Sequence, residues 1–447
     1  MKACVNTQTP LVRFNLSLEE FDKKYGGLPL PVNLKLLSEE KDFVFSPGGV
    51  TRMVYPLLRE LVNKGGEVHW VSLNPSFPLE AKIDNIFLHP ITLPAEKLKG
   101  YGVFKESLWK AFHGLSEGNL IDILWQREYS DYTYYNRLSS EKMLNLDKIF
   151  NFDFFYIHDF QQLPIGHMLH TVKRKIFRWH IPFDESSIPE EWKNFLSLYL
   201  NSYDAVIVSC KGYLKTLDLL GYNGKAYYIY PYLDPSHYSE PNELEVKAFK
   251  KRFSIEDKDR VILVVARLDP MKGQDRVIKA LRKVIKDFPN LKLLLVGNGS
   301  FSSSKQGIGL SKAEVWLNYL KELAKDLKVI FTGYLSQREL NVAYHISEFT
   351  ILPSIKEGFG LVVIESWLFK KPVIVSKRAG IAEIINEGEN GFLFDPEDLD
   401  TLADKMKDLL SNSEKAKKMG ERGFQTSKRC SIEEGIKEEV RLIESLI

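Results

Sequence analysis

The stretch FTILPSIKEGFGLVVIE, residues 349–365, decides the fold expected for this chain. Its first residues form an apolar run typical of a buried strand, and the apolar residues after Gly360 predict a helix. Gly358 and Gly360 permit a tight turn between the two, and the exposed N–H groups at the start of such a helix suit phosphate. Glu357 and Glu365 are therefore candidate binding residues, although the spacing alone fits a strand–turn–helix connection with two solvated glutamates equally well.

The same alternation of strand-like and helical stretches continues outward from this segment. Helical spacing of apolar residues covers 50–64, 274–288 and 311–327. Strands that alternate with helices predict an α/β fold with doubly wound parallel sheets. The strand-like runs are 67–73, 154–157, 175–179, 205–208, 226–229, 261–266, 292–296, 329–331, 349–352 and 372–375.

A segment rich in proline and charge, 231–260, divides these runs into two series. We therefore expect two Rossmann-like domains that face each other across a cleft, at residues 1–235 and 236–430. A final helix at 431–447 could cross back to the first domain. The residues before a short strand candidate at 41–45 show little periodicity and predict an irregular arm or lid.

Composition excludes several classes of protein. The 447 residues carry a net charge of +2, so no excess charge draws the chain to nucleic acid or to an anionic membrane. Three cysteines lie far apart without a CxxC pair, which favours a reducing compartment over a disulfide framework. No apolar run has the length of a signal peptide or a membrane span. We expect a cytoplasmic protein.

A second candidate motif, ARLDPMKG at 266–273, follows the apolar run VILVVA. Ligands of open α/β sheets bind at the carboxyl ends of strands. Arg267 could neutralise a diphosphate there as a fork and Lys272 as a point charge, although a basic loop taken alone is more often only a loop. Gly48-Gly49, before the first long helix, is a weaker signal. The phosphate-binding motif GxxxxGK[ST] is absent, as are HExxH and GxSxG.

Together, the Gly-Gly loop, the RxxxxK spacing and the EGFGxxxxE motif resemble the retaining glycosyltransferases of the GT-B fold, as in glycosyltransferase family 4. This resemblance covers residues 255–425. In the first half, YIHDFQQLP at 156–164 and RWHIPF at 178–183 resemble the paired HDYHL and HIPFP segments of trehalose-6-phosphate synthases. The chain departs from those synthases in carrying EGFG where they carry DGMN, and their N-terminal SNRLP segment is not recognisable.

The resemblance implies a donor site for a nucleotide glucose, with a UDP, ADP or GDP base that the sequence leaves open. Arg267 and Lys272 would stabilise the departing diphosphate. Backbone groups of Gly360-Leu361-Val362 would contact its phosphates, while Glu365 would accept hydrogen bonds from the ribose. Glu357 would hold the hydroxyls of the donor sugar.

The first half would complete the catalytic set. By resemblance, His180 would bind the donor sugar and Asp159 would orient hydroxyls of the donor or the acceptor. Gly48 and Gly49 would let the backbone approach the diphosphate. Neither a cofactor nor a metal ion is expected, because Arg267 and Lys272 would neutralise the diphosphate.

The expected acceptor site draws on the same resemblance. Tyr101 and Trp109 fit an aromatic pair of the trehalose-6-phosphate synthases, and Lys312 stands where they carry an Arg that contacts the acceptor phosphate. Arg52 could supplement Lys312, and Asp159 would also contact the acceptor. Without the resemblance, Lys312 is more simply a solvated residue at a helix start.

We therefore expect a retaining α-glucosyltransferase that makes trehalose 6-phosphate from glucose 6-phosphate, or trehalose from glucose, with the phosphorylated acceptor preferred. Two alternatives stay open: a family 4 transferase with another sugar, glycerate or glycan as acceptor, and a non-catalytic sugar-binding regulatory protein. Intact charged motifs argue against the second. The partners expected are small-molecule substrates, without nucleic acid or membrane, and a homo-oligomer is possible.

Overall fold

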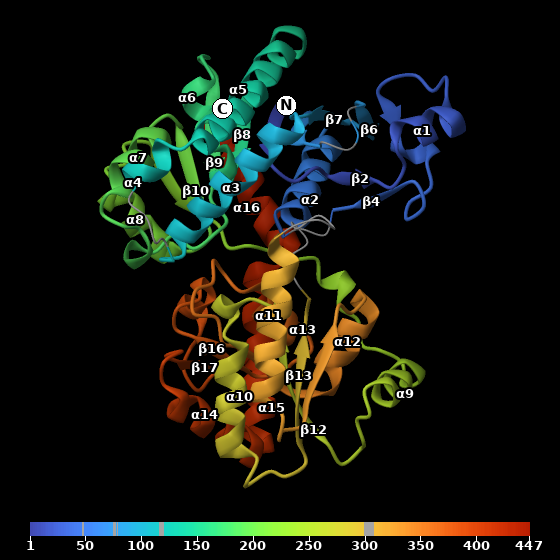
Figure 1. Cartoon of the computed structure of the whole chain (residues 1–447), viewed down its shortest axis with the longest axis vertical. Coiled ribbons are helices and arrows are strands. Elements are labelled where there is room, and N and C mark those ends of the chain that lie inside the picture. The colour runs from blue at the N-terminus through green and yellow to red at the C-terminus, as the bar shows by residue number, and fades with distance from the viewer. Residues whose placement is uncertain (47–48, 75–76, 78, 116–119, 299–307) are drawn as a thin grey trace. The chain divides into compact units, whose positions relative to one another are not determined.

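The computed structural model describes residues 1–46, 49–74, 77, 79–115, 120–298 and 308–447. The chain folds into two compact units, each an α/β structure around a parallel or mainly parallel sheet (Figure 1). The first unit contains Met1–Pro231 together with Gly435–Ile447, and the second contains Tyr232–Glu434.

The sheet of the first unit has nine strands among the described residues, in the order β11-β10-β9-β8-β1-β5-β7-β6-β3. Most neighbours are parallel, and β6 pairs with β7 in the antiparallel sense. The inner strands are apolar and buried on both faces, as expected where helices cover both sides. The strands are β1 (Lys2–Thr7), β3 (Val32–Asn33), β5 (Glu67–Leu73), β6 (Ala81–Ile83), β7 (Ile86–Ile91), β8 (Phe154–His158), β9 (Arg174–Arg178), β10 (Ala205–Val208) and β11 (Lys225–Tyr228).

Strand β1 corrects the expectation of an irregular N-terminal arm. It lies inside the sheet, in parallel pairing with β5 on one side and β8 on the other. Polar Asn6 and Thr7 interrupt its apolar run, so the sequence pattern conceals the strand. Both residues are buried and bonded: Asn6 Nδ2 donates to the Val71 carbonyl at 3.0 Å, and Trp70 Nε1 donates to Thr7 Oγ1 at 2.8 Å. Hydrogen bonding is what allows polar groups into a core strand.

The rest of the N-terminal region forms a small antiparallel ribbon of β2 (Val12–Phe14) and β4 (Phe43–Phe45), with α1 (Leu18–Tyr25) between them in the chain. Buried Asp42 fastens this region. Its carboxylate accepts hydrogen bonds from Lys24 Nζ at 2.5 Å and from the Tyr25 hydroxyl at 2.6 Å. These contacts lower the pKa of Asp42 to about 2 against the opposing effect of burial.

Aromatic side chains from α3 and α5 form much of the core of the first unit. Tyr101, Phe104, Tyr132 and Tyr135 belong to one buried cluster, and the Tyr101 and Tyr135 ring centroids lie 4.8 Å apart. Residues 101–135, which are rich in aromatic side chains, therefore contribute mainly to the core. The helices of this unit are α1, α2 (Gly49–Asn63), α3 (Ala95–Phe112), α4 (Leu120–Leu124), α5 (Arg127–Phe150), α6 (Ile165–Met168), α7 (Trp192–Leu200), α8 (Leu214–Leu219) and most of α16 (Ile432–Leu446).

The C-terminal helix α16 packs within the first unit although it follows the second unit in the chain. Glu444 of α16 pairs with Lys64, directly after α2, at 3.1 Å. Glu439 pairs with Arg178 of β9 in the interior of the unit. Figure 1 shows this helix in red beside α2.

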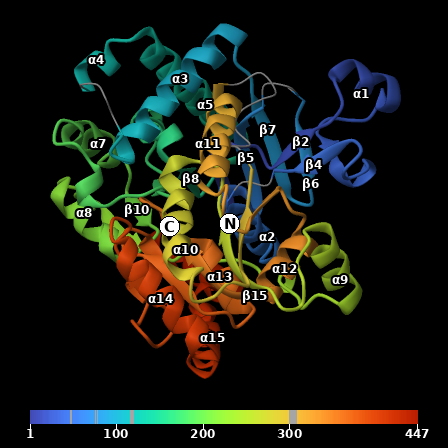
Figure 2. The ribbon, with the colours of Figure 1, turned by 60° about the horizontal axis from the view of Figure 1, so that its bottom comes forward.

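The second unit contains a six-stranded parallel sheet among its described residues, in the order β14-β13-β12-β15-β16-β17. Alternate residues of β12 face two apolar clusters: Ile262 and Val264 pack with α10 and α14, and Val261 and Leu263 pack with α9 and α12. The views in Figures 1 and 2 agree in placing α10 beside α14. The strands are β12 (Arg260–Val265), β13 (Leu291–Val296), β14 (Val329–Gly333), β15 (Ser347–Leu352), β16 (Val373–Ser376) and β17 (Phe392–Phe394), and the helices are α9 (Glu243–Arg252), α10 (Gln274–Val284), α11 (Ile308–Leu323), α12 (Gln337–Ile346), α13 (Leu361–Leu368), α14 (Leu399–Ser411) and α15 (Ser413–Ser427).

Candidate active site

In the second unit, the loop after β12 lies directly against the loop after β15. Gly273 marks this contact: its φ is +67°, and a Cβ there would collide with the Pro353 carbonyl oxygen. The Ile355 N–H donates to the Met271 carbonyl at 2.9 Å and fixes the two loops together. The two sequence motifs, each at the carboxyl end of its strand, therefore belong to one site.

Lys272 and Glu357 meet across these two loops. Lys272 Nζ lies 2.6 Å from Glu357 Oε2, and the Ser354 hydroxyl donates to the same oxygen at 3.1 Å. Burial would raise the pKa of the Glu357 carboxyl, but the positive charge and hydrogen bond of Lys272, with Ser354 and Arg267, hold that pKa below its ordinary value. The Glu357 carboxyl is thus ionised, and both side chains keep some exposure, 17% for Lys272 and 21% for Glu357.

Helix α13 begins where the glycine-rich turn ends. Gly360 has a φ of +116°, a conformation that favours glycine, and the first intrahelical contact runs from the Val363 N–H to the Gly360 carbonyl at 3.0 Å. Leu361 and Val362 occupy the first turn, where N–H groups have no intrahelical acceptor. The local structure therefore has the form of an anion site at a helix start.

Glu365, one turn further along α13, is held by two tyrosines. The Tyr238 hydroxyl donates to Glu365 Oε1 at 2.9 Å, and the Tyr344 hydroxyl donates to Oε2 at 2.7 Å. The carboxylate is nearly buried, with 8% exposure. Each oxygen has a further lone pair, so it can accept another hydrogen bond while the tyrosines fix its direction. No sequence motif pointed to Tyr238 or Tyr344.

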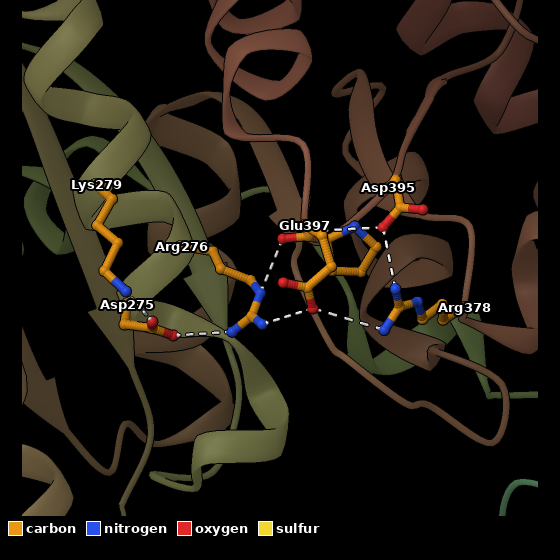
Figure 3. A network of polar contacts seen from close by, with 7 residues as sticks. Asp275, Arg276, Lys279, Arg378, Asp395 and Glu397 are labelled. Carbon is orange, nitrogen blue, oxygen red and sulfur yellow. Dashed lines mark hydrogen bonds and ion pairs between the residues drawn. The ribbon is translucent and has the colours of Figure 1, made fainter. Parts of the chain in front are cut away.

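A network of ion pairs ties the start of α10 to the loops after β16 and β17 (Figure 3). The Arg276 guanidinium donates to the Pro396 carbonyl and to Glu397, at 2.9 Å each, and Arg378 contacts Glu397 at 3.7 Å. The Glu357 N–H in turn approaches the Arg378 carbonyl at 3.4 Å. The network thus anchors the start of α10, at Arg276, and the loop that faces Glu357. The sequence did not indicate this network.

In the first unit, the predicted residues Asp159 and His180 gather with His158, which was not predicted, at the carboxyl ends of β8 and β9. The Asp159 N–H donates to the Arg178 carbonyl at 2.8 Å, and the His180 N–H donates to Asp159 Oδ1 at 3.3 Å. His158 Nδ1 and His180 Nε2 share a hydrogen bond of 3.1 Å. Asp159 has a φ of +72°, which is strained for a residue with a side chain and often marks a functional site.

Burial controls the charges of this group. It raises the pKa of Asp159 to about 7, although hydrogen bonds from His180 and Phe160 oppose the change. Burial also lowers the pKa of His158, with further contributions from His180 and Arg178, and lowers that of His180, with a contribution from Arg178. Near pH 7 the two imidazoles are neutral, and the Asp159 carboxyl is poised to hold or release a proton.

We expect Asp159→Asn to stabilise the protein at pH 8 and to leave its stability at pH 4 nearly unchanged. The folded pKa near 7 exceeds the ordinary aspartate pKa of 3.8, so the native state loses stability from Asp159 as pH rises through that interval. The variant carries no such charge. The melting temperature should rise by about 2 °C or more at pH 8, the shift that ~1 kcal/mol produces in a unit of this size.

The matched control is Asp42→Asn, which should act with the opposite sign. The folded pKa of Asp42, about 2, lies below the ordinary aspartate pKa of 3.8, so its carboxylate stabilises the native state above that interval. The variant should melt lower than the parent at pH 7. If the melting temperatures of Asp159→Asn and the parent differed by the same amount at every pH from 4 to 8, the raised pKa assigned to Asp159 would be contradicted.

A buried ion pair beneath the histidines was not anticipated from the sequence. Arg178 and Glu439 pair with 1% exposure each, the Tyr156 hydroxyl donates to Glu439, and Arg178 also donates to the Ile229 carbonyl at 3.3 Å. Arg178 directly precedes the WHIPF segment, so α16 supports the strand end that presents His180. The one signal in the sequence was an arginine directly after the apolar residues Ile176 and Phe177, at the end of a strand-like run.

The residues predicted to bind the acceptor differ in their burial and in their contacts. Tyr101 is 1% exposed and its hydroxyl makes no hydrogen bond with the described residues, while Asp159 lies near enough to contribute to the raised pKa of Tyr101, which is due mainly to burial. Trp109 is half-buried, and its ring stacks on His113 with centroids 3.9 Å apart. Their acceptor roles stay predictions.

The remaining predicted residues lie on helices or outside the described residues. Gly49 begins α2, and Arg52 is exposed in the first turn of that helix. Gly48 lies outside the described residues. Lys312 falls within α11, and its side chain is likewise outside what the structure describes.

Two further properties concern the described part of the chain. Its histidines, cysteines and acidic residues form no group of three or more that could hold a metal ion. Within the same residues, each helix is too short or too polar to cross a membrane.

Comparison with protein-family models gives two matches that together span both units. Residues 245–426 match the model of group 1 glycosyl transferases, and residues 101–215 match the N-terminal domain of trehalose synthase. The first range contains Arg267, Lys272, Glu357 and Glu365. The second range contains the histidine pair and Asp159.

Comparison of the chain with individual proteins supports both family matches. The trehalose synthase of Thermococcus litoralis is 31% identical over 70% of this chain and 73% of its own length, and that of Pyrococcus horikoshii is 32% identical over 70% and 72%. A solved trehalose-6-phosphate synthase covers 100% of both chains with a TM-score of 0.76 at 17% identity, which shows that the fold is GT-B. The chain is a glycosyltransferase, acting on a nucleotide sugar and an acceptor, and it belongs to the group 1 family that includes these trehalose synthases.

Proposed function

We propose that the protein transfers glucose from a nucleotide glucose to free glucose, with retention at the anomeric carbon, and so makes trehalose. The match of residues 101–215 to the trehalose synthase N-terminal domain carries this proposal, because that range holds His158, Asp159 and His180. It favours free glucose over glucose 6-phosphate, the acceptor that the sequence motifs favoured by themselves.

The reaction breaks the bond between the anomeric carbon and the diphosphate oxygen, and it forms a bond from that carbon to an acceptor hydroxyl oxygen. The acceptor proton leaves with the departing diphosphate. Negative charge therefore grows on the diphosphate in the transition state, and positive charge grows on the sugar. A catalyst must supply cations and hydrogen-bond donors at the diphosphate, and negative or polar groups near the sugar.

The second unit supplies the cations. Lys272 is held by Glu357 at 2.6 Å, and the start of α13 presents N–H groups at the neighbouring turn. We assign the diphosphate to Lys272, Arg267 and this helix start, and the ribose hydroxyls to Glu365. The contact with Lys272 keeps the Glu357 carboxyl ionised, so Glu357 can accept hydrogen bonds from the donor sugar while its partner faces the phosphate.

The first unit supplies groups of controlled charge. Neutral His180 binds a sugar hydroxyl without competing with the positive charge that develops on the donor. Asp159, with a pKa of about 7, exchanges a proton easily near neutral pH and orients the acceptor hydroxyl. Its hydrogen bond from the His180 backbone keeps the two groups in a fixed relation.

The acceptor is tested by steady-state kinetics with glucose and glucose 6-phosphate against each of several nucleotide glucoses. We expect a higher kcat/KM for glucose, and we expect Lys312→Ala to leave it unchanged. A higher kcat/KM for glucose 6-phosphate that falls selectively in Lys312→Ala would instead assign the protein to trehalose 6-phosphate formation.

A chelator is expected to leave the transfer rate largely unchanged, because Arg267 and Lys272 provide the positive charge that the diphosphate requires. The measurement compares the rate in EDTA with the rate after readdition of Mg²⁺ or Mn²⁺. Complete loss of the transfer activity in EDTA, restored by Mg²⁺ or Mn²⁺, would show that Arg267 and Lys272 do not suffice to neutralise the diphosphate.

A further inference from the structure

The two histidines of the first unit share one proton between ring nitrogens. His158 Nδ1 and His180 Nε2 lie 3.1 Å apart, and the ring planes are inclined by 18° with centroids 5.4 Å apart. Two neutral imidazoles can form this bond in two ways: either His158 donates from Nδ1, or His180 donates from Nε2. The choice fixes the opposite nitrogen of His180, which carries a proton in the first case and a lone pair in the second.

The surroundings of His158 distinguish the two arrangements. His158 is 1% exposed, and its Nε2 atom makes no hydrogen bond with the described residues. If His180 were the donor, the His158 proton would sit on Nε2 as a buried N–H without an acceptor. Buried N–H groups without partners are rarer than buried acceptors without partners, and leaving one costs about 1–3 kcal/mol. The arrangement with the proton on His158 Nδ1 avoids that cost.

We propose that His158 is a positioning residue that fixes the tautomer of His180, so that His180 presents its Nδ1–H as a hydrogen-bond donor. The ligand suited to this group is an oxygen of a sugar hydroxyl or a phosphate, and not a hydroxyl proton. This inference rests on the proposed function for the identity of that oxygen. The tautomer itself is a property of the unliganded protein.

The direct test is the protonation of the His180 ring nitrogens, read by long-range ¹⁵N–¹H correlation NMR on the full chain labelled with ¹⁵N-histidine. Loss of the corresponding signals in His180→Gln assigns them. We expect a protonated Nδ1 and an unprotonated Nε2 at neutral pH. A protonated Nε2 in the parent protein would overturn the proposal whether or not the protein transfers glucose, so the two failures are distinguishable.

Two substitutions of His158 separate tautomer control from packing. The amide nitrogen of His158→Asn falls where Nδ1 stands and can still donate, whereas His158→Leu fills the space without a donor. We expect the Asn variant to keep the His180 tautomer and the Leu variant to lose it, with kcat/KM about tenfold lower in Leu than in Asn, the effect of one hydrogen bond. His170→Asn, at an exposed histidine, is the control. Equal tautomers and equal rates in the two His158 variants would contradict the proposal.

Discussion

Replacing Lys272 with alanine is expected to lower kcat at least ~100-fold, and Arg267→Ala is expected to do the same, because each removes a fixed positive charge from the diphosphate as it departs. Lys272 also neutralises Glu357 at 2.6 Å, so its loss leaves a carboxylate that repels the phosphate. The measurement is the initial rate of nucleotide release with saturating donor and acceptor. The effect should appear in kcat more than in the KM of the acceptor.

Lys283→Ala provides the matched control. Lys283 lies on α10 in the same unit, and its partner Asp400 is a largely exposed residue. Surface ion pairs contribute little to stability, so this variant should keep both the fold and the rate of the parent. Rates near those of the parent in both Lys272→Ala and Arg267→Ala would show that the diphosphate binds elsewhere.

Removing the carboxylate of Glu439 is expected to destabilise the first unit by about 3–5 kcal/mol, the usual cost of leaving one charge of a buried pair without its partner. Arg178 and Glu439 are each 1% exposed, and the Tyr156 hydroxyl donates to the same carboxylate. Urea unfolding of Glu439→Ala, followed by tryptophan fluorescence, measures the change. Because Arg178 precedes His180, we also expect the transfer rate to fall at temperatures where the variant is still folded.

Glu444→Ala is the control for the same helix. Glu444 pairs with Lys64 at 3.1 Å, and the two side chains are 44% and 49% exposed. Exposed pairs of this kind contribute less than about 1 kcal/mol. A Glu439 variant no less stable than the Glu444 variant would contradict the role assigned to the buried pair.

Much of the fold could be predicted because long apolar runs mark buried parallel strands. The runs predicted at 67–73 and 205–208 have the same limits as β5 and β10. Strand β1 was not predictable in this way, since its apolar run covers only residues 3–5 and its polar Asn6 and Thr7 are buried through bonds to other segments. A pattern of single residues cannot show that such bonds exist.

The residues of the candidate site also divide into those that the sequence predicts and those that it does not. Lys272 and Glu357 could be predicted because each lies in a glycine-containing loop at the end of an apolar strand, where ligands bind. Glu439 could not be predicted, because it is one of two adjacent glutamates on a helix rich in glutamate. Only the orientation of that helix leaves Glu438 exposed and buries Glu439. Tyr344 and Arg276 share this property: their role depends on partners that the sequence does not connect to them.

The most direct test of the central claim is the product formed from a nucleotide glucose and free glucose. The parent protein is incubated with each donor and ¹³C-labelled glucose, and the product is identified by mass and by NMR of its anomeric carbons. We predict a non-reducing disaccharide with both anomeric centres in the α configuration, formed in step with nucleotide release. A β linkage, a reducing disaccharide, or nucleotide release without any disaccharide would contradict the account.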